Sequence, residues 1–268
     1  MGLMAMTGFA GCDKIEPEER LIALVTDEDV DPWPEGAVAY VEKYTGPRCS
    51  NCPNADRMIE GLQRLYGGHL IVVSVNSYRE AFGAPYNPNP DMRVAAAQAW
   101  EVAVGDPSLP AAFLNRGDTK YEGSMSNLGG GIDEALMSLP QVKVDLTATL
   151  EGQTLTIGTD MELREECTAS LTLTLMVIED SLRYKQDDGT ARVADYVHNH
   201  MLRAVVTDSW GKPVTIGTAA GSTASDQTTY TIGTPAIVPE NSHIVALVCN
   251  ASTHQVLGCA ECHISTVD

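Results

Sequence analysis

Two cysteines separated by two residues, Cys49 and Cys52, have the clearest chemical potential in this sequence. A strand-like segment precedes the pair, and a helical pattern follows it. The first turn of a helix carries unpaired N–H groups and the positive end of the helix dipole, which stabilise a thiolate. The charge of Arg48 acts in the same direction. The spacing predicts that Cys49 attacks a disulfide and that Cys52 resolves the mixed disulfide.

Two other interpretations of the pair stay open. A disulfide between Cys49 and Cys52 that never exchanges would only staple the loop. A structural zinc site is disfavoured because it usually needs four ligands. The only other Cys-x-x-Cys, Cys259 to Cys262, lies far away in the sequence. We therefore expect no metal and no cofactor.

The elements around the pair predict an α/β domain over residues 36–140. Strand patterns and helical patterns alternate along this part of the chain. The strand patterns cover 37–44, 69–75, 111–115 and the short segment 120–122, and the helical patterns cover 54–66, 93–102 and 132–138. The loop 78–91, rich in Pro and Asn, either covers the cysteine pair or widens the site.

This part of the chain resembles the thioredoxin superfamily. The resemblance rests on the strand, the Cys-x-x-Cys at a helix start, the next strand, and Leu109-Pro110 before a further strand. It implies a cis-proline at Pro110 that faces the dithiol and contacts the substrate backbone. It also suggests Glu42 as the counterpart of a buried carboxylate that transfers protons. The Trp-Cys-Gly-Pro-Cys motif of efficient reductants is missing, so the resemblance implies no redox potential.

The second half of the chain predicts a β-sandwich of immunoglobulin type over residues 141–268. Short alternating runs, such as VKVDLTATL, SLTLTLMVIED and SHIVALVCN, are separated by turn residues.

The histidines of this half resemble cofactor or metal ligands, but their sequence context disfavours such sites. Cys259 to His263 match the haem-attachment pattern Cys-x-x-Cys-His. They lie in a predicted strand, where residues three apart point to opposite faces, and this disfavours haem. One of the two cysteines could instead pair with Cys167 or Cys249, and the sequence does not choose among the three pairings of these four cysteines. We expect His198 and His200 on one solvated strand face. The other histidines of this half, His243, His254 and His263, are expected at the surface.

The start of the chain predicts an exported lipoprotein. Small residues before Cys12 resemble a lipobox, so residues 1–11 would be a signal peptide and Cys12 would carry lipid. The run departs from that pattern because no Lys or Arg precedes it. Residues 12–35 then form the lipidated Cys and an acidic tether. The six remaining cysteines would lie where disulfides persist.

The charge of the chain disfavours nucleic acid as a partner. The sequence has 36 acidic against 17 basic residues and a formal net charge of −19. Such a surface repels phosphate backbones and anionic lipid headgroups. No apolar run reaches the length of about 18 residues that a membrane-spanning helix needs.

From about residue 12 to the end, the sequence resembles the outer membrane protein 28 family of Gram-negative lipoproteins. The runs VEKYTGPRCSNCPNA, SLPAAFLNR and VHNHMLRAVVTD carry the resemblance. It implies an outer-membrane location, a lipid anchor on Cys12, and a thioredoxin-like domain followed by a β-sandwich. It implies no settled chemical activity.

Two hypotheses about function follow. The first is thiol–disulfide exchange on an extracytoplasmic protein or peptide, with Cys49, Cys52, Pro110 and Arg48 at the site. The second is a surface binding or adhesion lipoprotein in which the disulfide is structural. An exposed Cys49 favours the first hypothesis, whereas a buried Cys49 with the loop 76–91 folded over the pair favours the second.

Overall fold

The first half of the chain folds into the alternating strands and helices that the sequence predicts. Its elements are β1 (Ala39–Thr45), α2 (Cys52–Tyr66), the 3₁₀ turn η1 (Gly67–His69), β2 (Leu70–Asn76), α3 (Glu80–Gly83), η2 (Ala95–Ala97), α4 (Gln98–Ala103), β3 (Ala111–Leu114), β4 (Lys120–Glu122) and α5 (Leu128–Leu136). Strand β1 pairs parallel with β2 and antiparallel with β3, which gives the order β2-β1-β3-β4. The predicted helix at 93–102 is shorter and begins as a 3₁₀ turn.

The structure is a computed structural model that describes residues 32–233 and 237–267. The predicted signal peptide, the predicted lipidation site Cys12 and most of the predicted acidic tether lie outside the described residues. Among the described residues, no helix is long and apolar enough to cross a membrane.

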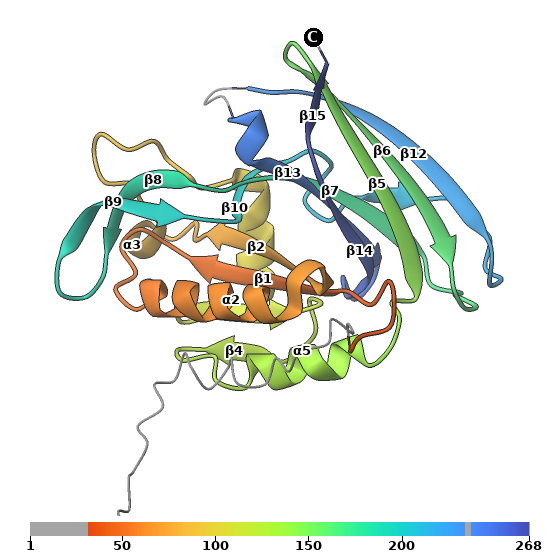
Figure 1. Ribbon diagram of the computed structural model, residues 1–268, viewed down its shortest axis with the longest axis horizontal. Helices are drawn as coiled ribbons and strands as arrows, with labels where there is room; N and C mark the ends of the chain where they lie inside the picture. The colour runs from red at the N-terminus through yellow and green to blue at the C-terminus, as the bar shows by residue number, and fades with distance from the viewer. Residues whose placement is uncertain (1–31, 234–236, 268) are drawn as a thin grey trace, which may run out of the picture. The chain divides into compact units, whose positions relative to one another are not determined.

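The regular elements of the second half of the chain are almost all strands. Its elements are β5 (Val142–Glu151), β6 (Thr154–Leu163), β7 (Leu171–Glu179), β8 (Leu182–Asp187), β9 (Arg192–His198), β10 (Met201–Val205), β11 (Lys212–Val214), β12 (Thr223–Thr231), η3 (Pro239–Asn241), β13 (Ser242–Asn250), β14 (Val256–His263) and β15 (Ser265–Val267). A sheet of order β12-β6-β5-β15 packs against β7 and β13. Figure 1 shows these strands as two layers. Buried side chains such as Ile157, Leu175 and Ile244 pack together between them.

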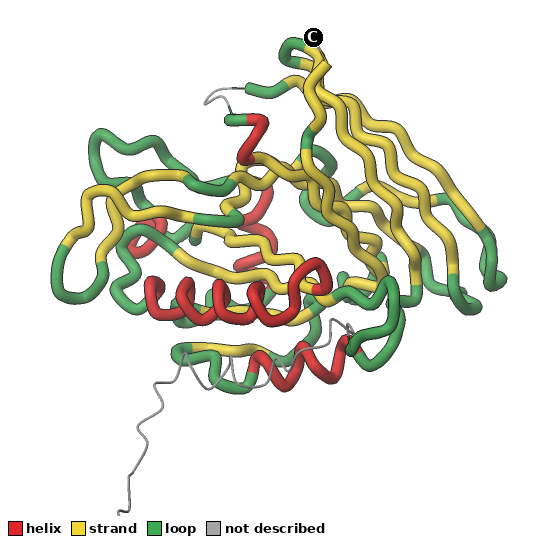
Figure 2. The backbone as a smooth tube through the Cα atoms, viewed as in Figure 1, coloured by secondary structure: helices red, strands yellow, loops and turns green. Residues whose placement is uncertain are grey.

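The two halves share one sheet. Strand β10 pairs antiparallel with β7 and parallel with β2, where Met201 lies opposite Ser74 and the Ser74 N–H donates to His200 O at 2.7 Å. The sheet therefore runs β14-β13-β7-β10-β2-β1-β3-β4 (Figure 2). The fold is mixed α/β with large sheets, but this topology does not confirm the predicted split into a thioredoxin-like domain and a separate immunoglobulin-like sandwich.

Alternate residues of β1 face two different cores, as the period of a strand requires. Val41 packs with Ile59 of α2 and Ile132 of α5. Tyr40 and Tyr44 face the opposite side, where they join a core that includes side chains from α4, β7 and β13.

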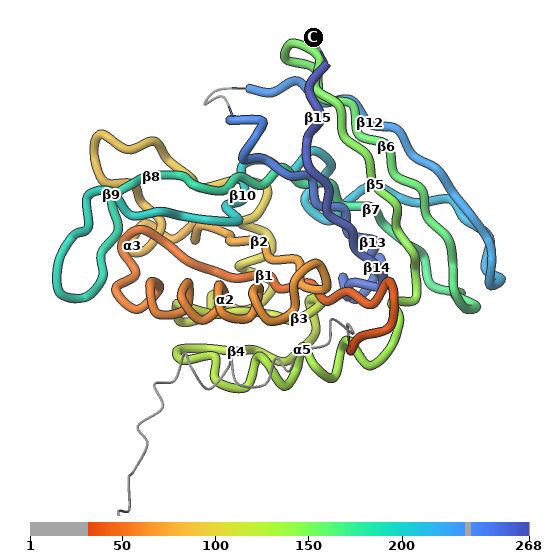
Figure 3. Tube along the Cα trace, viewed as in Figure 1, coloured from red at the N-terminus to blue at the C-terminus, as the bar shows by residue number. Residues whose placement is uncertain are grey.

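Strands β8 and β9 leave the large sheets as a separate hairpin. Among the strands that the structure describes, they pair only with each other, with Leu182 opposite His198 and Asp187 opposite Arg192. The hairpin extends toward α3 and the start of α2 (Figure 3). The sequence assigned these residues to the sandwich, but here they reach the region of the cysteine pair.

Candidate functional site

Cys49 and Cys52 form a disulfide at the point where the loop after β1 enters α2. Helix α2 begins at Cys52, with Pro53 in its first turn, and it ends before Gly67, which has a positive φ of 52°. Proline fits the first turn of a helix and glycine fits its end. The predicted Cys-x-x-Cys at a helix start is therefore present, with its Cα atoms 5.4 Å apart.

Both cysteines of this disulfide are buried. Cys49 is 3% exposed and Cys52 is 1% exposed. An attacking thiolate must approach a disulfide sulfur directly, so exchange depends on access to that sulfur. In this conformation the protein itself covers the disulfide.

The hairpin β8–β9 covers the loop that carries the disulfide. The side-chain amide of Gln186, which is 1% exposed, donates to Cys49 O at 2.9 Å and to Gly46 O at 3.2 Å. The Asp187 N–H donates to Pro47 O at 2.8 Å. At the turn of the hairpin, a Cβ on Gly189 would lie 3.5 Å from Ser50 O. These contacts join segments that are far apart in sequence, and no local sequence pattern predicts them.

The loop 78–91 closes the other side of the disulfide loop. The Arg48 N–H donates to Phe82 O at 3.0 Å, and the Arg48 guanidinium donates to Ala84 O at 2.9 Å and Pro85 O at 3.1 Å. Tyr86 offers its ring both to Arg48, at 4.8 Å, and to Arg192 of the hairpin, at 3.9 Å. Arg48 thus ties the loop to the disulfide segment. Its predicted action on a Cys49 thiolate stays a prediction.

A nearly buried ion pair lies behind the disulfide, on the face of β1 that packs against α2. Lys43 of β1 pairs with Asp56 of α2, and their side chains are 5% and 17% exposed. The Tyr196 hydroxyl of β9 donates to the other oxygen of Asp56 at 2.8 Å. Burial alone would raise the pKa of Asp56, but the charge and hydrogen bond of Lys43, with that of Tyr196, outweigh it and lower the pKa.

Asp56→Asn is expected to lower the free energy of unfolding by about 2 kcal/mol at neutral pH, because the variant leaves Lys43 buried without its counter-ion. The folded-state pKa of Asp56 is depressed, so its stabilisation is present above the unfolded pKa near 4 and is lost as the pH falls through the folded value. Urea unfolding from pH 7 to pH 3 should show the difference from wild type narrow only below about pH 4. A difference that is the same at pH 3 and pH 7 contradicts this role.

Glu42, suggested from the sequence as the proton-transferring carboxylate, lies on the opposite face of β1. It accepts hydrogen bonds from the Tyr44 hydroxyl at 2.6 Å and the Tyr40 hydroxyl at 3.0 Å, and it pairs with Arg116 at 2.8 Å. The suggestion was wrong because adjacent strand residues point to opposite faces. Lys43, rather than Glu42, faces α2.

Pro110 lies near the end of β1 from which the chain continues to the disulfide. The Leu109–Pro110 peptide bond is cis, as the sequence predicts, and Pro110 is buried. Strand β3 begins directly afterwards with Ala111 opposite Tyr44, near the end of β1 that leads to Cys49. A substrate contact by Pro110 stays a prediction.

The remaining described cysteines are free thiols, Cys167, Cys249, Cys259 and Cys262. Cys259 belongs to one core of β14 and Cys262 packs against the other, which confirms that the two face opposite sides of a strand. Burial raises the pKa of Cys249 and that of Cys262 to about 11. These thiols stay protonated at neutral pH and are weak nucleophiles.

His198 and His200 do not share a solvated strand face. His198 ends β9, is 5% exposed and packs against Tyr196, and burial lowers its pKa to about 4. His200 follows β9 with a positive φ of 58°, so the strand periodicity used for the prediction stops before it. The prediction was wrong for this reason.

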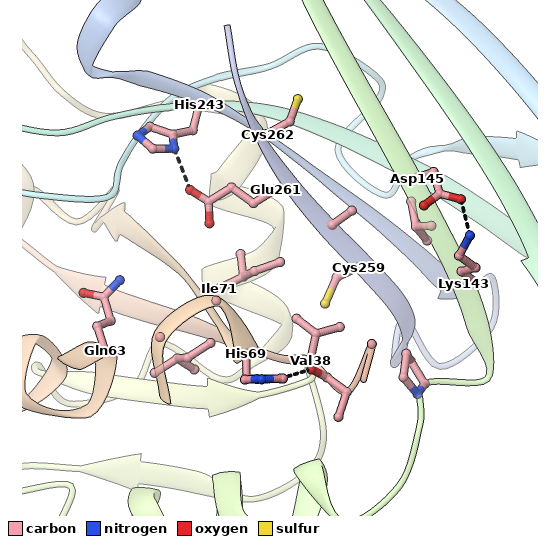
Figure 4. A pocket seen from close by; sticks show the side chains of 18 of the residues that line it. Val38, Gln63, His69, Ile71, Lys143, Asp145, His243, Cys259, Glu261 and Cys262 are labelled. Atoms are coloured by element: carbon pink, nitrogen blue, oxygen red, sulfur yellow. Dashed lines mark hydrogen bonds and ion pairs between the residues drawn. The ribbon is translucent and has the colours of Figure 1, made fainter. Parts of the chain in front are cut away.

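Three histidines come together beside a cavity of about 730 Å³, away from the disulfide. His243 Nδ1 lies 2.8 Å from Glu261, and this hydrogen bond raises the pKa of His243 (Figure 4). His200 lies 3.3 Å from Asp180, and the His263 ring is 4.2 Å from that of His243. His263 is exposed, as the sequence predicts, whereas the His243 side chain is only 15% exposed because its strand β13 lies between β14 and β7. Within the described part of the chain, no three metal-binding side chains are arranged to hold an ion.

Comparison with known proteins places the second part of the chain in a family. The model of a family described as outer membrane protein Omp28 matches residues 96–266. This span includes the hairpin β8–β9 but begins after Cys49 and Cys52. No curated protein matches the chain.

Two solved structures share the fold at low sequence identity. HBP35 of Porphyromonas gingivalis has a TM-score of 0.66 at 16% identity, over 85% of this chain and 76% of that chain. A protein from Agrobacterium tumefaciens has a TM-score of 0.51 at 15% identity, over 84% of this chain and 94% of that chain. A domain of the outer membrane lipoprotein Omp28 from Porphyromonas gingivalis matches with a TM-score of 0.36 at 17% identity, over 48% of this chain and 99% of that chain.

Proposed function

Because the chain belongs to the Omp28 family of outer membrane proteins, we propose that it is a binding lipoprotein of the outer membrane whose Cys49–Cys52 disulfide is structural. In this proposal residues 1–11 are a signal peptide and the lipid is attached to Cys12. Residues 12–35 tether the folded part to the membrane, on its periplasmic or its surface-exposed side.

The burial of the disulfide carries this proposal. Gln186, Asp187 and the turn of the hairpin cover one side of the loop, and residues 82–86 cover the other. Cys49 is 3% exposed, so a thiol of a partner protein has little access to it in this conformation. The same contacts join the hairpin, the loop and α2 into one surface, which is what a structural disulfide would stabilise.

We also propose that residues 36–140 are a thioredoxin-like part and that 141–268 are an immunoglobulin-like sandwich joined to it through the shared sheet. The order β2-β1-β3-β4, with a parallel pair followed by an antiparallel hairpin and a helix, supports the first assignment. The packing of Ile157 of β6 against the core that contains Leu175 of β7 joins two layers of strands and supports the immunoglobulin-like assignment. In the binding role the thioredoxin-like part is a scaffold.

Thiol–disulfide exchange is the second candidate, and the ion pair Lys43–Asp56 favours it. This pair stands one helical turn from Cys52, where a charged group can assist proton transfer to a thiol. In this alternative the hairpin opens, Cys49 is the nucleophile and Cys52 resolves. Arg48 and Pro110 then bind the incoming extracytoplasmic thiol or disulfide protein.

Native and unfolded reactivity distinguish the two functions. The full chain with Cys12→Ser is incubated with excess reduced glutathione, and alkylation of Cys49 and Cys52 is followed by mass spectrometry. We expect both residues to stay unlabelled in buffer and to become labelled in urea, because only unfolding exposes the disulfide.

Rapid labelling in buffer contradicts the structural role. Cys52→Ala then provides the check for exchange, since it should trap partner proteins on Cys49. A Cys49→Ala/Cys52→Ala variant is the control for trapping through the other thiols.

A further inference from the structure

We propose that two copies of this chain associate through the edge strand β12, which pairs antiparallel with the same strand of a second copy. This inference goes beyond the proposed function and does not depend on the state of the disulfide. It concerns the opposite end of the molecule, in the outer sheet of the sandwich.

Strand β12 has one open side. On its inner side it pairs with β6 along its whole length, from Thr223 opposite Glu162 to Thr231 opposite Thr154. It is the terminal strand in the order β12-β6-β5-β15, and within the described ranges no strand pairs with its other side. Figure 1 shows β12 at the outer margin of this sheet. Its free N–H and C=O groups can therefore accept a further strand.

Strand β12 lacks most of the usual protections of an edge strand. Natural edges are kept short, bulged, marked with lysine or proline, or given a charge that points inward. Strand β12 has nine residues, TASDQTTYT, with neither lysine nor proline, and its pairing with β6 has no register shift. Its one charged residue, Asp226, is paired with Lys212 at 2.6 Å. By contrast, the edge strands β4 and β15 have only three residues each.

The side chains of β12 fit a second copy of the same strand. Its exposed residues are all uncharged, Thr223, Ser225, Gln227, Thr229 and Thr231. A two-fold axis at Gln227 places Thr223 opposite Thr231 and Ser225 opposite Thr229, so every cross-strand pair on this face is neutral. Two copies that each carry −19 repel wherever acidic surfaces meet. A basic partner would gain no electrostatic attraction from an uncharged strand. A second acidic copy can approach this strand because no like charges meet there.

The size of this contact sets the expected strength. One strand pair buries less surface than a standard interface of about 800 Å² per partner, so we expect a dissociation constant on the order of micromolar or weaker. Confinement of both copies to one membrane would raise their effective concentration and favour the pair.

Analytical ultracentrifugation of the full chain with Cys12→Ser tests the proposal over a wide range of concentration. We expect a reversible dimer that strengthens as salt is added, because salt screens the repulsion between the two acidic copies. Gln227→Lys should weaken it by at least about fivefold, because two lysines then face each other at the axis.

Thr149→Lys is the matched control. It adds the same charge on the exposed face of the same sheet, but on β5, away from the open edge, and it should leave the dimer intact. A monomer at every concentration, or a dimer that both lysine variants change equally, overturns the proposal.

Cross-linking gives a second readout that does not depend on affinity. Residues directly opposite each other in an antiparallel pair have Cβ atoms about 5 Å apart, so Gln227→Cys should form disulfide-linked dimers under mild oxidation. Thr149→Cys should not. Equal cross-linking of the two variants contradicts pairing through β12.

Discussion

Replacement of Arg116 by methionine is expected to lower the free energy of unfolding by about 3 to 5 kcal/mol, because it leaves a buried carboxylate without its cation. Glu42 is 2% exposed and Arg116 is 6% exposed, and they form an ion pair of 2.8 Å. The Arg116 guanidinium also lies 4.4 Å from the centre of the Trp100 ring. Urea unfolding at pH 7 measures the loss.

The double variant Glu42→Gln/Arg116→Met is the control for this prediction. It removes both charges, so most of the stability should return, since a neutral amide can still bond to the hydroxyls of Tyr40 and Tyr44. A loss below about 1 kcal/mol for the single variant would mean that water reaches Glu42 and that this core is open.

Gln186→Leu is expected to make the Cys49–Cys52 disulfide react about tenfold to a hundredfold faster with dithiothreitol. The change removes the hydrogen bonds from the Gln186 amide to Gly46 O and Cys49 O, and each carbonyl keeps only one donor, the N–H of Cys49 and that of Cys52 respectively. Loss of such bonds costs about 1 to 3 kcal/mol, which favours opening of the hairpin by the corresponding factor. The rate of alkylation after reduction gives the measurement.

Arg183→Ala is the matched control for Gln186→Leu. Arg183 lies on the same hairpin and pairs with Asp195, but both side chains are largely exposed, so the pair adds little stability. Its reduction rate should equal that of the wild type. If Gln186→Leu also reacts at the wild-type rate, the disulfide does not depend on the hairpin for its protection.

Local sequence patterns predicted the elements that carry the disulfide. The start of α2 at Cys52 follows from the cysteine spacing, the proline and the helical periodicity, all within a few residues. The opposite faces of Cys259 and Cys262 follow from the period of a strand. The cis bond before Pro110 followed from a resemblance whose motif is also local.

The contacts that cover the disulfide are non-local, which is why the sequence did not predict them. Gln186 reaches Cys49 O across a separation of 137 residues, and Tyr196 reaches Asp56 across 140. Both hydrogen bonds depend on the direction in which the β8–β9 hairpin extends from the large sheets. The alternation of apolar and polar residues in its strands does not predict that direction. The continuous sheet likewise depends on one pairing, Met201 with Ser74.

The choice between Glu42 and Lys43 shows the limit of a resemblance. Both residues are charged and adjacent in the sequence. They differ in the face of β1 from which they project, and only Lys43 projects toward α2. Strand register is set by packing on both sides, so an error of one residue moves a side chain to the wrong core.

The reduction potential of the Cys49–Cys52 disulfide tests the structural role most directly. The full chain with Cys12→Ser is equilibrated with thiol buffers of known potential, and the state of this pair is read by mass spectrometry after alkylation. A structural disulfide covered by the hairpin should have a potential below about −300 mV. A value above about −230 mV, in the range of exchange enzymes, would contradict the structural role and favour an oxidoreductase whose hairpin opens.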